Sequence, residues 1–66
     1  MKVDGATLRR LRKKRGLTMQ ELGKAAEVGP ITIGRLEKGC QLAQLTTVRK
    51  LAEILEVDLS DLLVNK

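Results

Sequence analysis

The side chains best suited to chemistry in this sequence are positively charged, and they cluster. Residues 9–15 hold six basic side chains: Arg9, Arg10, Arg12, Lys13, Lys14 and Arg15. Lysine and arginine bind anions, and a guanidinium group also forms paired hydrogen bonds with a phosphate or a base edge. A charge run can equally be a solvated helix face, partly stabilised by the helix dipole. The cluster favours phosphate contact by at least two of these side chains, with a solvated face as the alternative.

The overall charge points to the same kind of partner. The 66 residues include 13 basic and 8 acidic side chains, for a net charge of +5. This favours nucleic acid or an anionic membrane surface. No apolar stretch approaches the roughly 20 residues that span a bilayer. Because the first residues also lack the apolar segment of a signal peptide, we expect a cytoplasmic chain that does not engage a membrane.

The usual tools of catalysis are missing from the sequence. There is no histidine and only one cysteine, Cys40. Ser-His pairs, Cys-His pairs and zinc clusters are therefore excluded. A lone cysteine cannot form an intramolecular disulfide, which suits a reducing compartment. The six glycines are scattered, without the spacing of a phosphate-binding loop. We expect no enzyme activity, no metal, no cofactor and no small-molecule ligand.

The elements that would position the basic residues are predicted to be helices. Thr18, followed by Glu21, has the spacing of a capping box that starts a helix over about 19–26. Pro30 suits the first position of a second helix because it has no N–H to leave unpaired. Gly39 suits a left-handed cap at its end. Two short helices joined by a tight turn form a helix-turn-helix.

Further helices are predicted on both sides. Asp4 is the expected N-cap of a helix that Gly16 ends. After the helix-turn-helix, apolar residues recur with the period of a buried helix face: Leu45, Val48, Leu51, Ala52 and Leu55. Asp58 and Asp61 have the spacing of a capping box for a last short helix. We therefore expect an all-α, compact five-helix bundle forming one domain over residues 1–66.

The sequence resembles the phage repressor and Cro-like (XRE-type) helix-turn-helix family. The resemblance extends from about residue 6 to residue 64. Its core is Leu17-Thr18, Glu21-Leu22, Ala26, Val28, Thr32-Ile33 and Arg35-Leu36-Glu37-Lys38-Gly39. It implies that the helix over about 19–26 lies across the DNA backbone, and that the recognition helix, about Pro30–Lys38, enters the major groove. It also implies an ion pair between Arg12 and Glu37 that orients two helices.

The resemblance assigns ten residues to a double-stranded DNA interface: Arg10, Lys13, Lys14, Thr18, Gln20, Pro30, Ile31, Thr32, Arg35 and Lys38. Arg35 is suited to bidentate hydrogen bonds with guanine, and Ile31 to contact with a thymine methyl group. Gly34 lowers helix propensity by roughly 1 kcal/mol relative to alanine. It would serve a close backbone approach, or it has no role.

The leading hypothesis is a sequence-specific DNA-binding protein, a bacterial or phage-encoded transcriptional repressor or regulator that binds as a homodimer. Apolar residues near the end outnumber those that a short helix can bury and would form the dimer patch: Leu59, Leu62, Leu63 and Val64. The alternative is a protein-interaction or antitoxin-like module on the same fold with weak DNA binding. It is motivated by the apolar residues Met19, Pro30, Ile31 and Leu42 at positions where polar contacts are usual.

Overall fold

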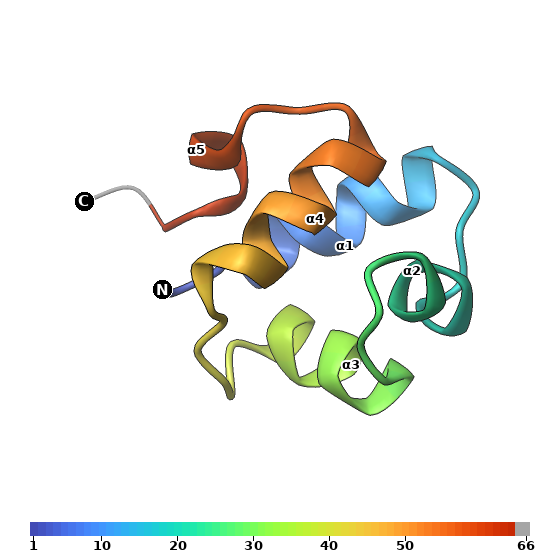
Figure 1. Ribbon diagram of the computed structural model, residues 1–66, viewed down its shortest axis with the longest axis horizontal. Helices are drawn as coiled ribbons and strands as arrows, with labels where there is room; N and C mark the ends of the chain where they lie inside the picture. Colours follow the sequence, from blue (N-terminus) through green and yellow to red (C-terminus); the bar gives the residue numbers. More distant parts are fainter. Residues whose placement is uncertain (65–66) are drawn as a thin grey trace.

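The computed structural model describes residues 1–64 and is all-α in architecture, as predicted. Figure 1 shows its five helices: α1 (Gly5–Lys14), α2 (Met19–Ala25), α3 (Pro30–Lys38), α4 (Leu45–Leu55) and α5 (Leu59–Leu62). Helix α2 packs on α3, α1 packs on both α3 and α5, and α4 packs on α5 and α2. The last two residues of the predicted single domain lie outside the described part of the chain.

The predicted helix ends are confirmed within one residue. The Asp4 carboxylate accepts a hydrogen bond from the Thr7 N–H at 3.3 Å at the start of α1. In the capping box of α2, the Glu21 N–H donates to the Thr18 hydroxyl at 3.0 Å, and the Thr18 N–H donates to the Glu21 carboxylate at 2.9 Å. Gly39 has the left-handed φ of 74° that ends α3. Local sequence therefore fixes where the helix-turn-helix begins and ends.

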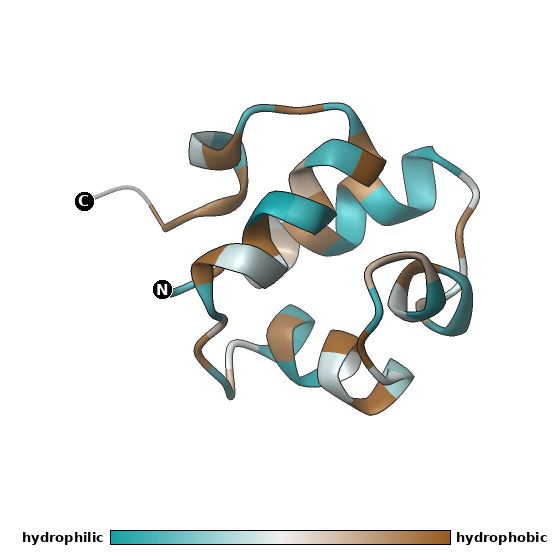
Figure 2. Cartoon of the chain, in the orientation of Figure 1, coloured by the Kyte–Doolittle hydropathy of each residue, from teal (hydrophilic) through white to brown (hydrophobic). Residues whose placement is uncertain are grey.

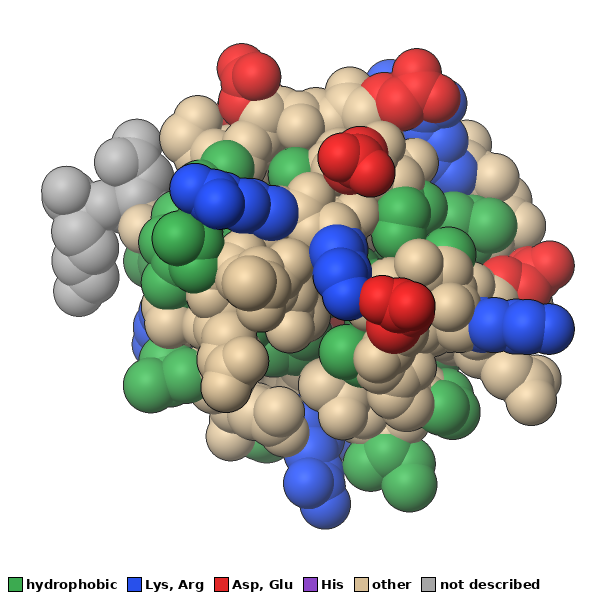
Figure 3. All heavy atoms as spheres, in the orientation of Figure 1, with side chains coloured by type: hydrophobic (Ala, Val, Ile, Leu, Met, Phe, Trp, Pro, Cys, Tyr) green, Lys and Arg blue, Asp and Glu red, His purple; other side chains and the backbone are tan. Residues whose placement is uncertain are grey.

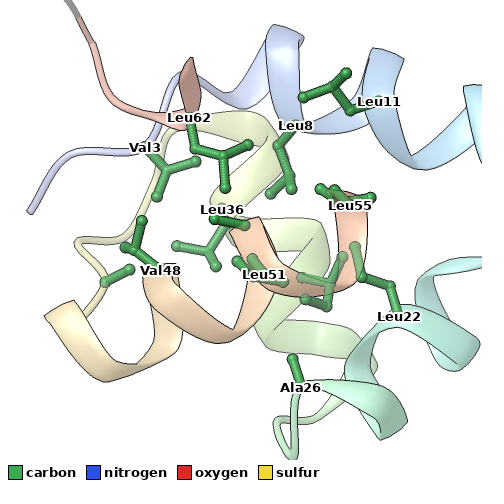
Figure 4. Close-up of a cluster of buried hydrophobic side chains, with 13 residues drawn as sticks. Val3, Leu8, Leu11, Leu22, Ala26, Leu36, Val48, Leu51, Leu55 and Leu62 are labelled. Carbon is green, nitrogen blue, oxygen red and sulfur yellow. The ribbon is translucent and has the colours of Figure 1, made fainter. Parts of the chain in front are cut away.

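A core of small aliphatic side chains holds the helices together (Figure 4). Its largest fully buried members are Leu8, Leu22, Ile33, Leu36, Leu51, Leu55, Leu62, Val3 and Val48. Hydrophilic and hydrophobic residues alternate along the helices (Figure 2), as expected for helices with one buried face. The predicted apolar stripe of α4 is confirmed except at Leu45, which is 40% exposed. Leu45 is the first residue of α4, so the stripe runs past the edge of the bundle there.

The predicted dimer patch is wrong for Leu62, which is fully buried in the core. Leu59 and Leu63 are half-buried and pack against that core. The reason is the N-terminal segment, for which the sequence predicted no contact with the end of the chain. The Asp4 N–H donates to the Leu62 carbonyl at 2.7 Å, and the buried Val3 forms an isolated antiparallel bridge with Leu63. Residues 1–4 thus supply the surface that covers α5.

Residues 1–4 also form hydrogen bonds with the connection between α3 and α4. The Met1 ammonium donates to the Ala43 carbonyl at 2.7 Å, and the Ala43 N–H donates to the Met1 carbonyl at 2.8 Å. Val64 returns toward the segment, with its N–H 3.1 Å from the Lys2 carbonyl. Four residues are too few to show a period of hydrophobicity, so pattern reading could not find this strand-like piece.

Candidate nucleic-acid interface

Helix α3 is held against the bundle by one face only. Ile33 and Leu36 are fully buried, whereas Ile31 on the outer side is 70% exposed. Pro30, Arg35 and Lys38 are exposed as well. Because residues three and four apart share a helix face, the buried pair leaves a continuous outward face at these other positions. That face is free to meet a large partner.

The backbone of α2 is in close contact with the turn that leads to α3. A Cβ atom on Gly23 would lie 2.7 Å from the carbonyl oxygen of Val28, in the turn between the two helices. Only glycine permits so short a distance. The turn also contains Glu27, whose φ of 61° is uncommon for a residue with a side chain. The helix-turn-helix is therefore a tight unit with little freedom at its turn.

The predicted ion pair between Arg12 and Glu37 is confirmed, and it is buried. Arg12 Nε lies 2.6 Å from Glu37 Oε2, with the side chains 9% and 4% exposed. A second guanidinium nitrogen is 3.3 Å from Glu37 Oε1, and a third donates to the Leu17 carbonyl at 2.8 Å. Arg12 is thus buried, unlike the other basic residues of α1. It links α1, the connection before α2, and α3.

Helix α1 touches the far end of α3 at Gly5. A Cβ atom there would lie 2.1 Å from the Glu37 carbonyl oxygen, which excludes any side chain without a backbone shift. Together with the buried ion pair, this contact fixes the position of α1 relative to the recognition helix. The basic residues of α1 therefore have a fixed position relative to α3.

The exposed basic residues of α1 are Arg9, Arg10, Lys13, Lys14 and, at its C-cap, Arg15. Within residues 1–64, ion pairs involve only Arg12, Arg15 and Lys50 among the basic side chains. Arg9 with Lys13, and Arg10 with Lys14, stand four residues apart and so form two adjacent rows along the helix. Arg9 is not among the predicted interface residues, although its row and exposure match those of Lys13.

The start of α2 also carries exposed polar side chains. Thr18 and Gln20 are exposed. The Thr18 oxygen accepts a hydrogen bond within the capping box, which leaves its O–H as a donor. Gln20 occupies the second position of the helix, where its amide is available to an acceptor in solvent. Both residues keep donors that a phosphate oxygen could accept.

Met19, Pro30, Ile31, Gly34, Arg35 and Lys38 line an open hollow of about 420 Å³, which we call the α3 notch. Figure 3 shows basic and apolar side chains together at the edge of the molecule where α3 lies. A Cβ atom on Gly34 would meet only the Met19 sulfur, at 3.6 Å. Packing inside the described chain therefore does not require glycine at this position.

Thr32 differs from the other predicted interface residues. It is half-buried and lines a separate hollow of about 250 Å³ with Val28, Leu36 and the loop before α4. The remaining nine predicted residues are exposed. Leu42, in the same loop, is 68% exposed and does not pack under the loop. Its apolar side chain is therefore available to a partner.

Lys50 of α4 forms an ion pair with Glu27, in the turn between α2 and α3. Lys50 Nζ lies 2.5 Å from Glu27 Oε1. The hydrogen bond from Lys50, with the attraction of its charge, lowers the pKa of the Glu27 carboxyl below its ordinary value. Both side chains are exposed, so the ion pair adds little to the free energy of unfolding.

The part of the chain that the structure describes has neither a cluster of metal ligands nor a helix suited to a membrane. Among residues 1–64, no three His, Cys, Asp or Glu side chains come together in a group that could hold a metal ion. None of the helices described has the length and apolar character needed to cross a membrane. The exposed face of α3 and its basic surroundings remain the candidate site.

The fold and the exposed face of its third helix define the class as a helix-turn-helix protein. A helix-turn-helix family model (HTH_3) matches residues 8–62. The chain belongs to this family, and the predicted resemblance to phage repressors and XRE-type regulators is confirmed. Comparison with curated protein sequences found no significant match.

Solved structures give similar chains of the same architecture. The restriction-modification controller protein C.AhdI from Aeromonas hydrophila is 28% identical, with a TM-score of 0.81 over 86% of each chain. The clp gene regulator ClgR from Corynebacterium glutamicum is 28% identical, with a TM-score of 0.83 over 91% of this chain and 64% of its own. The P22 c2 repressor, solved with a synthetic operator, has a TM-score of 0.90 over 100% of both chains at 23% identity.

Proposed function

We propose that this chain is a sequence-specific double-stranded DNA-binding protein, with α3 as the recognition helix in the major groove. The observation that carries the proposal is the exposed face of α3, which the buried Arg12–Glu37 pair fixes in orientation relative to α1, a helix with exposed basic residues. A helix fits the major groove, where base edges differ in their donors, acceptors and methyl groups. A chain of the same fold, the P22 c2 repressor, was solved with an operator.

The ten interface residues divide into two roles. Phosphates would be bound by Arg10, Lys13 and Lys14 of α1, by Thr18 and Gln20 at the start of α2, and by Lys38. Base edges would be read by Pro30, Ile31, Thr32 and Arg35. Arg35 is the only one of these four with a charged donor, and its fork matches guanine O6 and N7. Phosphate contacts position the protein, and base contacts select the sequence.

We further propose that the chain acts as a transcriptional repressor or regulator in the cytoplasm of a bacterium, encoded by it or by a phage, and binds as a homodimer. C.AhdI and ClgR, both 28% identical, are a controller and a gene regulator. A twofold dimer would place two α3 helices on half-sites about one turn of DNA apart. The single domain over residues 1–66 would then be the DNA-binding unit.

The experiment is selection from a randomised duplex pool, with affinity measured by fluorescence anisotropy at several salt concentrations. We expect salt-sensitive binding and enrichment of a palindromic motif. Arg35→Ala is the test variant. Arg49→Ala, which removes an exposed arginine of α4 outside the proposed interface, is its control. Absence of binding at low salt would contradict the proposal, and binding without enrichment would limit it to backbone recognition.

A second candidate function is a protein-interaction module, and the exposure of Ile31 and Leu42 is the observation that favours it. Ile31→Glu separates the two hypotheses. In a DNA-binding protein the new carboxylate would repel the phosphates, so affinity for every duplex would fall. In a protein-interaction module, binding to DNA would be weak before and after the change. We favour DNA binding because the apolar residues of α3 stand beside Arg35 and Lys38.

A further inference from the structure

We propose that the α3 notch is a binding pocket for thymine methyl groups and that Gly34 determines its specificity. This inference rests on the proposed function, since it assigns a base preference to the same helix face. Under this inference, the apolar residues of the recognition surface take part in recognising the DNA sequence. It also gives Gly34 a role that packing within the chain does not provide.

The wall of the notch is largely apolar. Pro30 and Ile31 lie in the first turn of α3, and Met19 at the start of α2 lines the same hollow. Proline and isoleucine side chains have neither donors nor acceptors, and the methionine thioether is only a weak acceptor. Such a surface gains nothing from a base amine or carbonyl and would leave it without a partner. A methyl group is the base substituent that it suits.

Two basic side chains also line the notch, and their charge indicates which kind of partner binds there. Arg35 and Lys38 border the hollow and are exposed. An apolar wall beside two cations suits a DNA duplex, which presents methyl groups between two rows of phosphates. In the major groove only thymine carries a C5 methyl group. An apolar side chain of a protein partner would instead leave both cations facing an uncharged surface.

Gly34 sets the depth of the notch. Any Cβ at this position would meet only the Met19 sulfur, so a side chain here would project into the hollow rather than into the core. Glycine is the least favourable residue in a helix interior after proline. Its presence lowers the propensity of α3 and leaves room for a group that comes from outside the chain.

The test compares thymine with uracil, which differs only by the C5 methyl group. The duplex enriched by selection is resynthesised with deoxyuridine at each thymidine position in turn, and its Kd is measured by anisotropy. We expect about fourfold weaker binding at one or two positions per half-site, the effect of removing one buried methyl group. Binding and enrichment with no loss at any position would overturn this inference and leave the proposed function intact.

Filling the notch with a larger side chain should remove the discrimination between thymine and uracil. Gly34→Leu is expected to bring the thymine-to-uracil ratio of affinities close to one, with the helical circular dichroism unchanged. Ala6→Leu adds the same side chain at an exposed position of α1 outside the notch and should keep the ratio. An unchanged ratio in Gly34→Leu would overturn the inference. No binding of the original protein to any duplex would overturn the proposed function as well.

Discussion

At the scale of single residues, the most consequential contact is the one between Arg12 and Glu37. The guanidinium group makes three hydrogen bonds, two to the carboxylate and one to a backbone carbonyl. Buried charges are tolerated when they are paired and hydrogen-bonded in this way. The pair therefore orients α1 against α3 more than it adds net stability. Its loss should be costly because one charge would remain buried without its partner.

Glu37→Gln tests this account. The amide keeps the shape of the side chain but leaves the Arg12 charge without a counter-charge, so the free energy of unfolding should fall by about 3 kcal/mol. Urea denaturation followed by circular dichroism measures the change. Glu53→Gln, at an exposed position of α4, is the control and should shift the midpoint little. An equal midpoint for the original protein and Glu37→Gln would refute the orienting role.

The turn residue Glu27 should titrate below the ordinary pKa of a glutamate. Because its pKa is lowered in the folded state, the ion pair with Lys50 stabilises the fold above the unfolded pKa and loses this effect as the pH falls through the folded pKa. NMR titration of the side-chain carboxyl carbon measures it. In Lys50→Met the Glu27 pKa should rise to its ordinary value. A Glu27 pKa that is the same in both proteins would show that the contact does not form in solution.

At the scale of elements, helix ends were predictable and long-range contacts were not. The capping box at Thr18, Pro30 at the start of α3 and Gly39 at its end all act within a few residues of the chain. Leu62 was misassigned because its burial depends on Val3, about sixty residues away in sequence. The Arg12–Glu37 contact is also long-range, and it was predictable only through the family resemblance. Residue spacing alone does not place two distant charges together.

Glycine-to-alanine substitutions distinguish positions that need glycine from one that does not. Gly34→Ala should raise the free energy of unfolding by about 1 kcal/mol, since the new Cβ makes an ordinary contact with Met19 and helix propensity improves. Gly5→Ala should lower it by about 2 kcal/mol, because the backbone of α3 must move away. Thermal and urea unfolding compare the two variants. A stabilised Gly5→Ala would show that α1 and α3 are not in close contact.

At the scale of the whole molecule, an aliphatic core joins a helix with exposed basic residues, α1, to a helix with an exposed outer face, α3. The net charge of +5 and the lack of histidine already pointed toward an anionic partner and away from common enzyme chemistry. The sequence could not show that Gly34 lies in a hollow, and only the family resemblance indicated that Arg12 leaves the basic surface. Both follow from how the helices pack. The interface residues on regular helix faces were therefore easier to predict than the shape of the surface between them.

Salt dependence separates the proposed phosphate contacts from the base contacts. Lys13→Ala should reduce the slope of log K against log salt concentration by about 1 and leave the selected motif unchanged. Anisotropy with the selected duplex at four or more salt concentrations gives the slope. Arg49→Ala, outside the proposed interface, should leave it unaltered. A slope that Lys13→Ala does not change would remove α1 from the phosphate-binding surface.

The most direct test of the central claim is to repeat the duplex selection with Arg35→Ala and compare its motif with that of the original protein. If the outer face of α3 reads base edges, the preference for guanine should be lost at one position of each half-site, at a cost of about 1–3 kcal/mol for that duplex. The other positions of the motif should remain. An unchanged motif, with affinity lowered equally for all sequences, would contradict base reading by α3 and make Arg35 one more phosphate contact.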